Sequence, residues 1–134
     1  MSQPNRLTAA DIMTTKVVSR GSQEDLTRIA VEMQRHQIGS VVIMDNKKLV
    51  GILTERDFVR VVERVGTFLE RSLAKDHMTS PVFTVQSDAP LAEVTKLMAE
   101  KHVRHIIVLN KKREVAGIIS SRDIMKATKE DMTI

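Results

Sequence analysis

The chain has 134 residues, of which 42% are hydrophobic and 28% are charged, and its formal net charge at pH 7 is +4. This composition is ordinary for one folded domain with a substantial core and argues against disorder. The absence of cysteine excludes disulfides, thiolate metal sites and a cysteine nucleophile. With three Phe and no Trp or Tyr, the chain is poor in the aromatic residues that stack on single-stranded nucleic acid, which argues against binding of that kind.

The net charge indicates the kind of binding partner, and the N-terminal segment indicates the cellular location. The positive charge favours an anionic partner, which could be a phosphate-bearing small molecule, nucleic acid or an acidic protein surface. Residues 1–6 lack the apolar centre of a signal peptide, and no apolar run approaches the roughly 18 residues of a membrane span. We therefore expect a soluble cytoplasmic protein that does not contact membranes.

The sequence contains an internal repeat, which determines the expected architecture. Residues 11–19 align with residues 76–84, and one extra residue near Arg113 then brings GILTERD at 51–57 onto GIISSRD at 117–123. The expected organisation is an N-terminal tail and start of the first repeat at 1–10, a first repeat at 11–65, a connector at 66–75, a second repeat at 76–128 and a C-terminal tail at 129–134.

Each copy begins with a short strand and an amphipathic helix. The strands are predicted at residues 17–18 and 82–85, where β-branched or aromatic residues cluster. In the first copy, Ser22-x-x-Asp25 predicts a capping box before a helix with Leu26 and Met33 on its apolar face. In the second copy Pro90 is the expected first helical residue. Met33 and its counterpart Met98 are expected in the core.

The second half of each copy is predicted as a hairpin followed by a second helix. Residues 41–44 and 106–109 are apolar runs suited to a sheet that is buried on both faces, and polar turns join them to strands at 49–53 and 115–119. The connector, with Phe68, Leu69 and Leu73 at helical spacing, is expected to be helical. The predicted fold class is α/β, with two tandem β-α-β-β-α repeats packed as a pseudo-twofold module.

The doubled motif allows two interpretations. Thr54-x-x-Asp57 and Ser120-x-x-Asp123 fit capping boxes, in which hydroxyl and carboxylate satisfy backbone amides at a helix start. The same helix N-terminus would suit a phosphate, and its carboxylate could accept both hydroxyls of a ribose. In the ligand interpretation, a glycine upstream lets the ligand approach the backbone and neighbouring arginines contact the phosphate.

The repeat, the Asp-x-Met-Thr openings at residues 11–14 and 76–79, and the two Gly-h-h-Thr/Ser-x-x-Asp endings together resemble a pair of CBS domains, the Bateman module. The resemblance covers residues 11–128. It implies two clefts near the pseudo-twofold axis that take an adenosine-bearing molecule such as AMP, ADP, ATP or S-adenosylmethionine. It implies a regulatory ligand and no cofactor.

The resemblance also implies roles for particular residues. Asp57 and Asp123 would hold ribose hydroxyls, Thr54 and Ser120 would contact ribose or phosphate, and the base would lie against residues that begin the strands. The full expected ligand-binding set is Thr15, Val17, Ile38, Gly51, Thr54, Arg56, Asp57, Ser80, Val82, Val103, Arg104, His105, Gly117, Ser120, Arg122 and Asp123.

The two copies differ where the second strand begins. The second copy has Val103, Arg104 and His105 at the positions where the first has Ile38, Gly39 and Ser40, so only the second offers a cation and an imidazole there. The first copy has nothing at that place to neutralise a polyphosphate. We therefore expect the two clefts to differ in occupancy.

Other signals are weaker. His77, His102 and His105 have no spacing typical of a metal site, so no metal is expected. Ser120 and His105 lack an activating third group, so no catalytic residues and no enzymatic activity are expected.

The expected function is a stand-alone regulatory module that signals to an effector protein or another subunit. A homodimer could form through Phe58, Val62, Ile124 and Met125 on the second helices. The alternative is a nucleic-acid-binding or protein-docking module with unoccupied clefts, which would use basic hairpin tips at residues 47–48 and 111–113.

Overall fold

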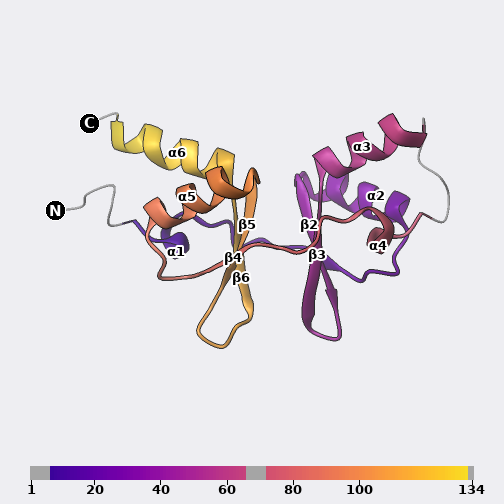
Figure 1. Cartoon of the computed structure of the whole chain (residues 1–134), viewed down its shortest axis with the longest axis horizontal. Helices are drawn as coiled ribbons and strands as arrows, with labels where there is room; N and C mark the ends of the chain where they lie inside the picture. Colours follow the sequence, from indigo (N-terminus) through magenta and orange to yellow (C-terminus); the bar gives the residue numbers. More distant parts are fainter. Residues whose placement is uncertain (1–6, 66–71, 133–134) are drawn as a thin grey trace. The chain divides into compact units, whose positions relative to one another are not determined.

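The computed structural model describes residues 7–65 and 72–132, which form two compact units (Figure 1). One unit comprises residues 18–82 and is called here the first-repeat unit. The other combines residues 1–17 with 83–134 and is called the second-repeat unit. Each unit contains one three-stranded sheet, and its helices lie against one face of that sheet. The α/β fold class with two β-α-β-β-α repeats is therefore confirmed.

The first-repeat unit follows the predicted order of elements. Its elements are β1 (Ser19–Arg20), α2 (Leu26–His36), β2 (Ser40–Asp45), β3 (Lys48–Thr54), α3 (Glu55–Val65) and α4 (Ala74–His77). The short β1 pairs in parallel with β2, and β2 pairs antiparallel with β3 in a register that places Val42 opposite Ile52. The polar turn between β2 and β3 is only two residues long, which is typical of a hairpin.

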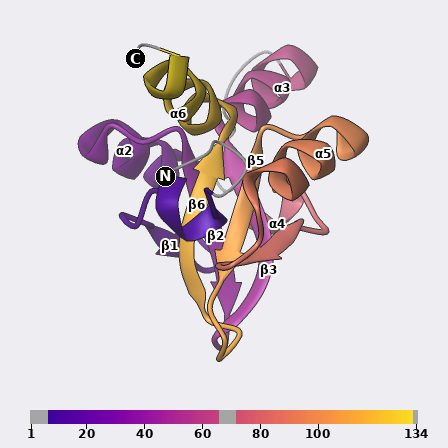
Figure 2. The ribbon, with the colours of Figure 1, turned by 90° about the vertical axis from the view of Figure 1, so that its left-hand side faces the viewer.

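The second-repeat unit repeats this arrangement (Figure 2). Its elements are α1 (Ala9–Ile12), β4 (Thr84–Gln86), α5 (Leu91–Lys101), β5 (His105–Leu109), β6 (Val115–Ser120) and α6 (Ser121–Met132). The sheet order is β4-β5-β6, with β4 parallel and β6 antiparallel to β5. The helix α6 extends through Met132 and so includes most of the range expected to be a tail.

The segment before each repeat's first strand packs in the unit formed by the other repeat. Thr14 exchanges two backbone hydrogen bonds with Ile118 of β6, at 2.8 and 3.0 Å, and Thr79 does the same with Ile52 of β3, at 2.8 and 3.1 Å. A Cβ atom at Gly117 would lie 2.8 Å from the carbonyl oxygen of Thr14. The glycines of the doubled motif therefore let a chain segment lie directly on the strand.

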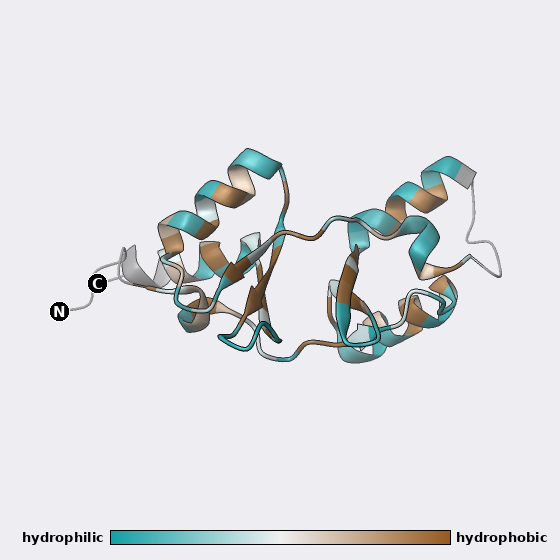
Figure 3. Cartoon of the chain, turned by 60° about the horizontal axis from the view of Figure 1, so that its bottom comes forward, coloured by the Kyte–Doolittle hydropathy of each residue, from teal (hydrophilic) through white to brown (hydrophobic). Residues whose placement is uncertain are grey.

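Each unit has its own hydrophobic core between sheet and helices. Figure 3 shows the strands as mainly hydrophobic, with hydrophilic hairpin tips. The predicted core methionines, Met33 and Met98, are buried in the two clusters. In β2 the consecutive residues Val41, Val42 and Ile43 are all buried, as expected for a continuous apolar run.

Two local predictions in the first copy are wrong. Ser22 does not cap α2. Its hydroxyl donates instead to Asp45 at the end of β2, and Asp25 caps the helix by accepting from the amide of Thr27 at 2.7 Å. The first strand begins at Ser19 rather than residue 17, since its pairing with β2 starts where the carbonyl of Val18 accepts from Val42.

The proposed dimer face also needs correction. Phe58 is buried and Ile124 packs against the core, so neither is an exposed apolar residue. The predicted Val62 and Met125 are exposed, and so is Val59, which was not predicted. Because Phe58 packs toward the core, the next residue of α3, Val59, lies on the outer side of the helix. A short apolar run does not indicate which of two adjacent residues faces the core.

Part of the predicted connector, including Phe68 and Leu69, lies outside the described residues. After it, Leu73 bridges to Asp25 and α4 follows at once. None of the described helices has the length and apolar character needed to cross a bilayer.

Replacing Gly117 with alanine should destabilise the fold by about 1–3 kcal/mol, because the new methyl group would meet the Thr14 carbonyl and the Met13 sulfur. Urea unfolding measures the effect. The control is Gly21→Ala, where the nearest atom to a new Cβ lies 3.6 Å away and we expect a change within about 0.5 kcal/mol. Equal losses in the two variants would contradict the close approach.

The hydrogen bonds from the hydroxyl and amide of Ser22 lower the pKa of Asp45. A lowered folded pKa stabilises the fold above the ordinary value of 3.8, and this contribution is lost as pH falls through the folded value. In Ser22→Ala the Asp45 pKa should therefore rise toward its ordinary value, measured by carbon NMR of the carboxyl group. An unchanged titration would show that the hydroxyl does not hold the carboxylate.

Candidate functional site

The doubled motif forms a reciprocal cap at both junctions between the third strand and the second helix. In the first-repeat unit, Asp57 Oδ2 accepts from the Thr54 amide at 2.9 Å and from the Thr54 hydroxyl at 3.1 Å. The Thr54 Oγ1 in turn accepts from the Asp57 amide at 3.3 Å. The predicted capping box is therefore confirmed in the first copy.

The second-repeat unit has the same cap with nearly the same geometry. Asp123 Oδ2 accepts from the Ser120 amide at 2.8 Å and its hydroxyl at 3.1 Å, and Ser120 Oγ accepts from the Asp123 amide at 3.2 Å. Both caps leave the other carboxylate oxygen, Oδ1, outside the capping bonds. This second oxygen is where the two copies differ.

Asp57 is engaged on both oxygens and is only 4% exposed. Its Oδ1 accepts from the Thr79 hydroxyl at 2.9 Å and lies 3.8 Å from an Arg60 nitrogen. Asp123 is half-buried, and within the described parts of the chain no hydrogen bond joins it to Thr14, the counterpart of Thr79. The Oδ1 of Asp123 is thus more available to a ligand than that of Asp57.

The structure brings the predicted phosphate-contacting residues of the second copy together. His105 lies opposite Ser120 in the β5–β6 ladder, and the Arg104 carbonyl accepts from the amide of Ser121 at 2.9 Å. Arg122 follows in the first turn of α6, and both arginines are exposed. A cationic edge therefore adjoins the Ser120–Asp123 cap.

The equivalent edge of the first copy has the opposite character. Ser40 lies opposite Thr54, and the Gly39 carbonyl accepts from the Glu55 amide at 3.1 Å. The Glu55 carboxylate covers Gly39, where an added Cβ would lie 2.6 Å from Oε1. The predicted Arg56 is exposed in the next position of α3. The sequence indicated that the first copy lacks a cation here, but it did not indicate this carboxylate. Glu55 is the first-repeat residue equivalent to Ser121 in the second repeat.

The remaining predicted residues are distributed between the two units. Ile38 and Val103 pack against the two cores, immediately after residues that end α2 and α5 in the left-handed region. The exposed Thr15 and half-buried Val17 belong to the second-repeat unit, and Ser80 and Val82 belong to the first. At Gly51 the strand is covered by Met78 and Thr79, as Gly117 is covered by Met13 and Thr14.

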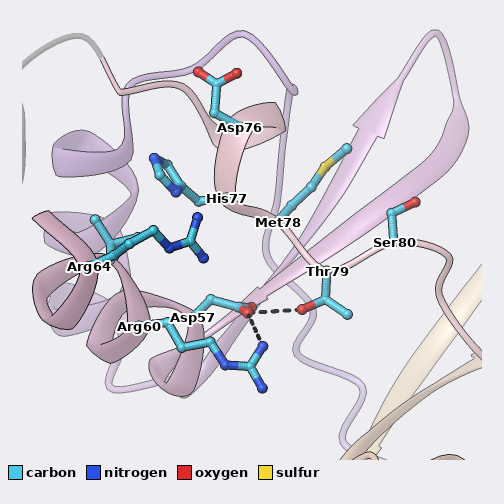
Figure 4. Close-up of a pocket in the computed structure, with 9 residues that line it drawn as sticks. Asp57, Arg60, Arg64, Asp76, His77, Met78, Thr79 and Ser80 are labelled. Atoms are coloured by element: carbon cyan, nitrogen blue, oxygen red, sulfur yellow. Dashed lines mark hydrogen bonds and ion pairs between the residues drawn. The ribbon is translucent and has the colours of Figure 1, made fainter.

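A pocket of about 270 Å³ lies beside α3 and α4 in the first-repeat unit (Figure 4). Two predicted residues, Asp57 and Ser80, line it. The complete lining is Asp57, Arg60, Val61, Arg64, Asp76, His77, Met78, Thr79 and Ser80. Sequence analysis did not predict Arg60, Arg64 or His77 as neighbours. The signal lay in the spacing Asp57, Arg60, Arg64, which places all three on one face of a helix.

The described residues contain no group of three or more histidine, aspartate or glutamate side chains that could hold a metal ion. His102 is exposed at the end of α5, and His77 lies in the first-repeat unit. The hydroxyls of Thr54 and Ser120 donate to the carboxylates three residues on, and the same carboxylate oxygens accept from backbone amides.

The chain is thus a tandem α/β repeat with a capped strand–helix junction in each copy. The CBS domain family matches it at residues 9–64 and 74–130. The protein belongs to this family, and its two repeats form a CBS pair, which is a regulatory module.

Relatives match most of the chain. "Hypoxic response protein 1" of Mycobacterium tuberculosis is 33% identical over 89% of this chain and 83% of its own length. The uncharacterized protein MK0525 of Methanopyrus kandleri is 33% identical over 90% of this chain, which spans only 62% of that protein. The CBS domain pair of protein MJ0100, solved with 5′-methylthioadenosine and S-adenosyl-L-methionine, is 25% identical, covering 93% of this chain and 98% of that one, with a TM-score of 0.82.

Asp57→Ala should destabilise the protein by about 3 kcal/mol, because it removes charge-assisted bonds from a buried network. Asp123→Ala should cost only about 1 kcal/mol, the typical value of a helix cap. Urea unfolding of both variants gives the comparison. Equal losses would show that the bonds from Thr79 and Arg60 add nothing to the Asp57 cap.

Proposed function

We propose that the protein is a regulatory module that binds an adenosine-containing ligand, AMP, ADP, ATP or S-adenosylmethionine, at its two capped junctions. The observation that carries this proposal is the Ser120–Asp123 cap with Arg104, His105 and Arg122 beside it. A carboxylate with an available oxygen suits the two hydroxyls of a ribose, and the neighbouring cations suit phosphate. The ligands of the MJ0100 pair, both adenosine derivatives, support this class of ligand.

In this proposal the site of the second repeat binds the ligand more readily than the site of the first. Asp123 can accept a ribose hydroxyl on Oδ1 without giving up its capping bonds. At Asp57 a ribose would have to replace the Thr79 hydroxyl and displace Arg60. The Glu55 carboxylate over Gly39 would also repel a polyphosphate at the edge that Arg104 occupies in the second repeat.

The bound ligand would act by stabilising one arrangement of the protein over another, which requires different affinities for the two states. The signal would pass to an effector protein or to a second subunit. The exposed Val59, Val62 and Met125 on α3 and α6 are the residues we propose for a homodimer face. We infer no catalytic step, because the carboxylates that accept from the two cap hydroxyls also accept from backbone amides and serve as helix caps.

Asp123→Ala should abolish or strongly weaken binding of the preferred adenosine ligand, identified first by a thermal-shift screen of the four candidates. Isothermal titration calorimetry then gives a dissociation constant that we expect to rise at least tenfold. The control is Asp11→Ala. Asp11 caps α1 in the same unit with the same bonding pattern, to the Thr8 amide at 2.8 Å and its hydroxyl at 3.0 Å.

Two outcomes would contradict the proposal. If Asp11→Ala weakens binding as much as Asp123→Ala, the aspartate acts through stability alone. If no adenosine compound shifts the melting transition while a short RNA binds with a steep salt dependence, the protein is a nucleic-acid-binding module instead.

A further inference from the structure

The pocket beside α3 and α4 has a chemical character that the proposed adenosine sites do not explain. Arg60 and Arg64 extend into it from successive turns of α3, and His77 extends into it from the end of α4 (Figure 4). Arg60 and Arg64 lie on the helix beyond the capped junction, and the helix N-terminus contributes only Asp57. The pocket therefore presents cationic and imidazole groups at a place separate from the strand-entry edge.

The carboxylates that line the pocket already have donors. Asp57 accepts from Thr54 on one oxygen and from Thr79 on the other. Asp76, at the exposed rim, accepts from the Leu73 amide at 3.4 Å. Asp57 is therefore engaged within the fold on both oxygens, whereas Asp76 lies at the rim with one oxygen outside this bond.

The donors of the pocket are not engaged in the same way. Among the described residues none forms a hydrogen bond or ion pair with Arg64, and Arg60 reaches only Asp57, at 3.8 Å. The Nδ1 of His77 is buried, and no residue in the described ranges forms a hydrogen bond with it. A buried polar atom without a partner costs free energy, and an incoming acceptor would remove that cost.

We propose that this pocket binds an oxyanion of the phosphate class, held by Arg60, Arg64 and His77. Two guanidinium groups can each donate two parallel bonds to a phosphate, and the imidazole Nδ1 can donate a further one in the tautomer that carries its proton there. The proposal goes beyond the adenosine sites, because it needs no ribose and no base. The anion is either free, as phosphate or pyrophosphate, or the phosphate chain of a nucleotide.

The second repeat lacks the donors of this pocket. At the positions equivalent to Arg60, Arg64 and His77 the sequence has Lys126, Glu130 and Ile12. The second repeat thus offers a phosphate one cation at these positions, where the first offers two guanidinium groups and an imidazole. The two repeats therefore place their phosphate-binding residues differently: the second at its strand-entry edge, and the first at this pocket.

The test uses pyrophosphate as the probe and the full chain as the protein. Isothermal titration calorimetry compares the wild type with Arg64→Glu and His77→Ile, which introduce the residues that the second repeat carries. We expect the dissociation constant to rise at least tenfold in each. Arg64 is exposed near the end of α3, so Arg64→Glu should fold normally, as checked by circular dichroism, and His77→Ile provides an independent second variant.

A matched control separates a defined site from general charge attraction. Arg28→Glu makes the same charge change as Arg64→Glu at an exposed position of α2 in the same unit. This variant should bind pyrophosphate within about twofold of the wild type, since Arg28 does not line the pocket. Equal weakening by Arg28→Glu and Arg64→Glu would show that pyrophosphate responds to overall charge, and the proposal would be wrong.

Parallel titrations with ATP and adenosine identify the source of the anion. Arg64-dependent binding of pyrophosphate alone indicates a free anion, and Arg64-dependent binding of ATP alone indicates the nucleotide chain. Adenosine binding should be equal in the wild type and Arg64→Glu. If adenosine does not bind but pyrophosphate does, the anion site stands without the proposed adenosine function. If neither pyrophosphate nor ATP depends on Arg64, the anion site is refuted.

Discussion

The structure depends on a reciprocal bond between a hydroxyl residue at the end of the third strand and an aspartate one turn into the following helix. This bond fixes the junction between strand and helix, because it engages the amide of the last strand residue and the amide of the aspartate. It occurs in both repeats with distances that agree within 0.1 Å, from 2.8 to 3.3 Å. The carboxylate that a ligand would need is therefore positioned by the fold before any ligand is present.

A second constraint acts on the strand that leads to this cap. Gly51 and Gly117 leave room for Met78 and Met13, and the following threonines pair with the strands. This packing brings the Thr79 hydroxyl onto Asp57. The segment that precedes one repeat thus completes the unit of the other, so the boundaries of the sequence repeat and those of the compact units differ. Only at Thr79 does this segment also reach a cap carboxylate, since among the described residues Thr14 forms no hydrogen bond with Asp123.

Much of this fold could be predicted from the sequence. The doubled motif, the apolar runs and the helical periodicity are local signals, and they gave the element order, the capping boxes and the core methionines. The errors arose where tertiary contacts decide between local options. Ser22 could cap a helix or bond to Asp45, and only the position of the β2 end favours the second. Likewise, the sequence gives no indication whether Phe58 or Val59 faces the core.

Part of the candidate site could also be predicted from the sequence. Asp57 and Asp123 are marked by the repeat itself, and Arg104 and His105 by the difference between the copies. The helical spacing of Asp57, Arg60 and Arg64 is visible in the sequence, but arginines on an exposed helix face are usually solvated and so do not indicate a pocket. His77 lies 13 residues after Arg64, and no local signal in the sequence indicates that it joins the same pocket.

The comparison of the two repeats separates what the backbone requires from what a ligand would require. The cap residues, the glycines and the Met-Thr segments are common to both copies, and each has a structural role within its unit. The charged residues around them are not common: Glu55 stands where Ser121 does, Gly39 where Arg104 does, and His77 where Ile12 does. In the proposed function, these differences give one scaffold two sites that attract anions at different places.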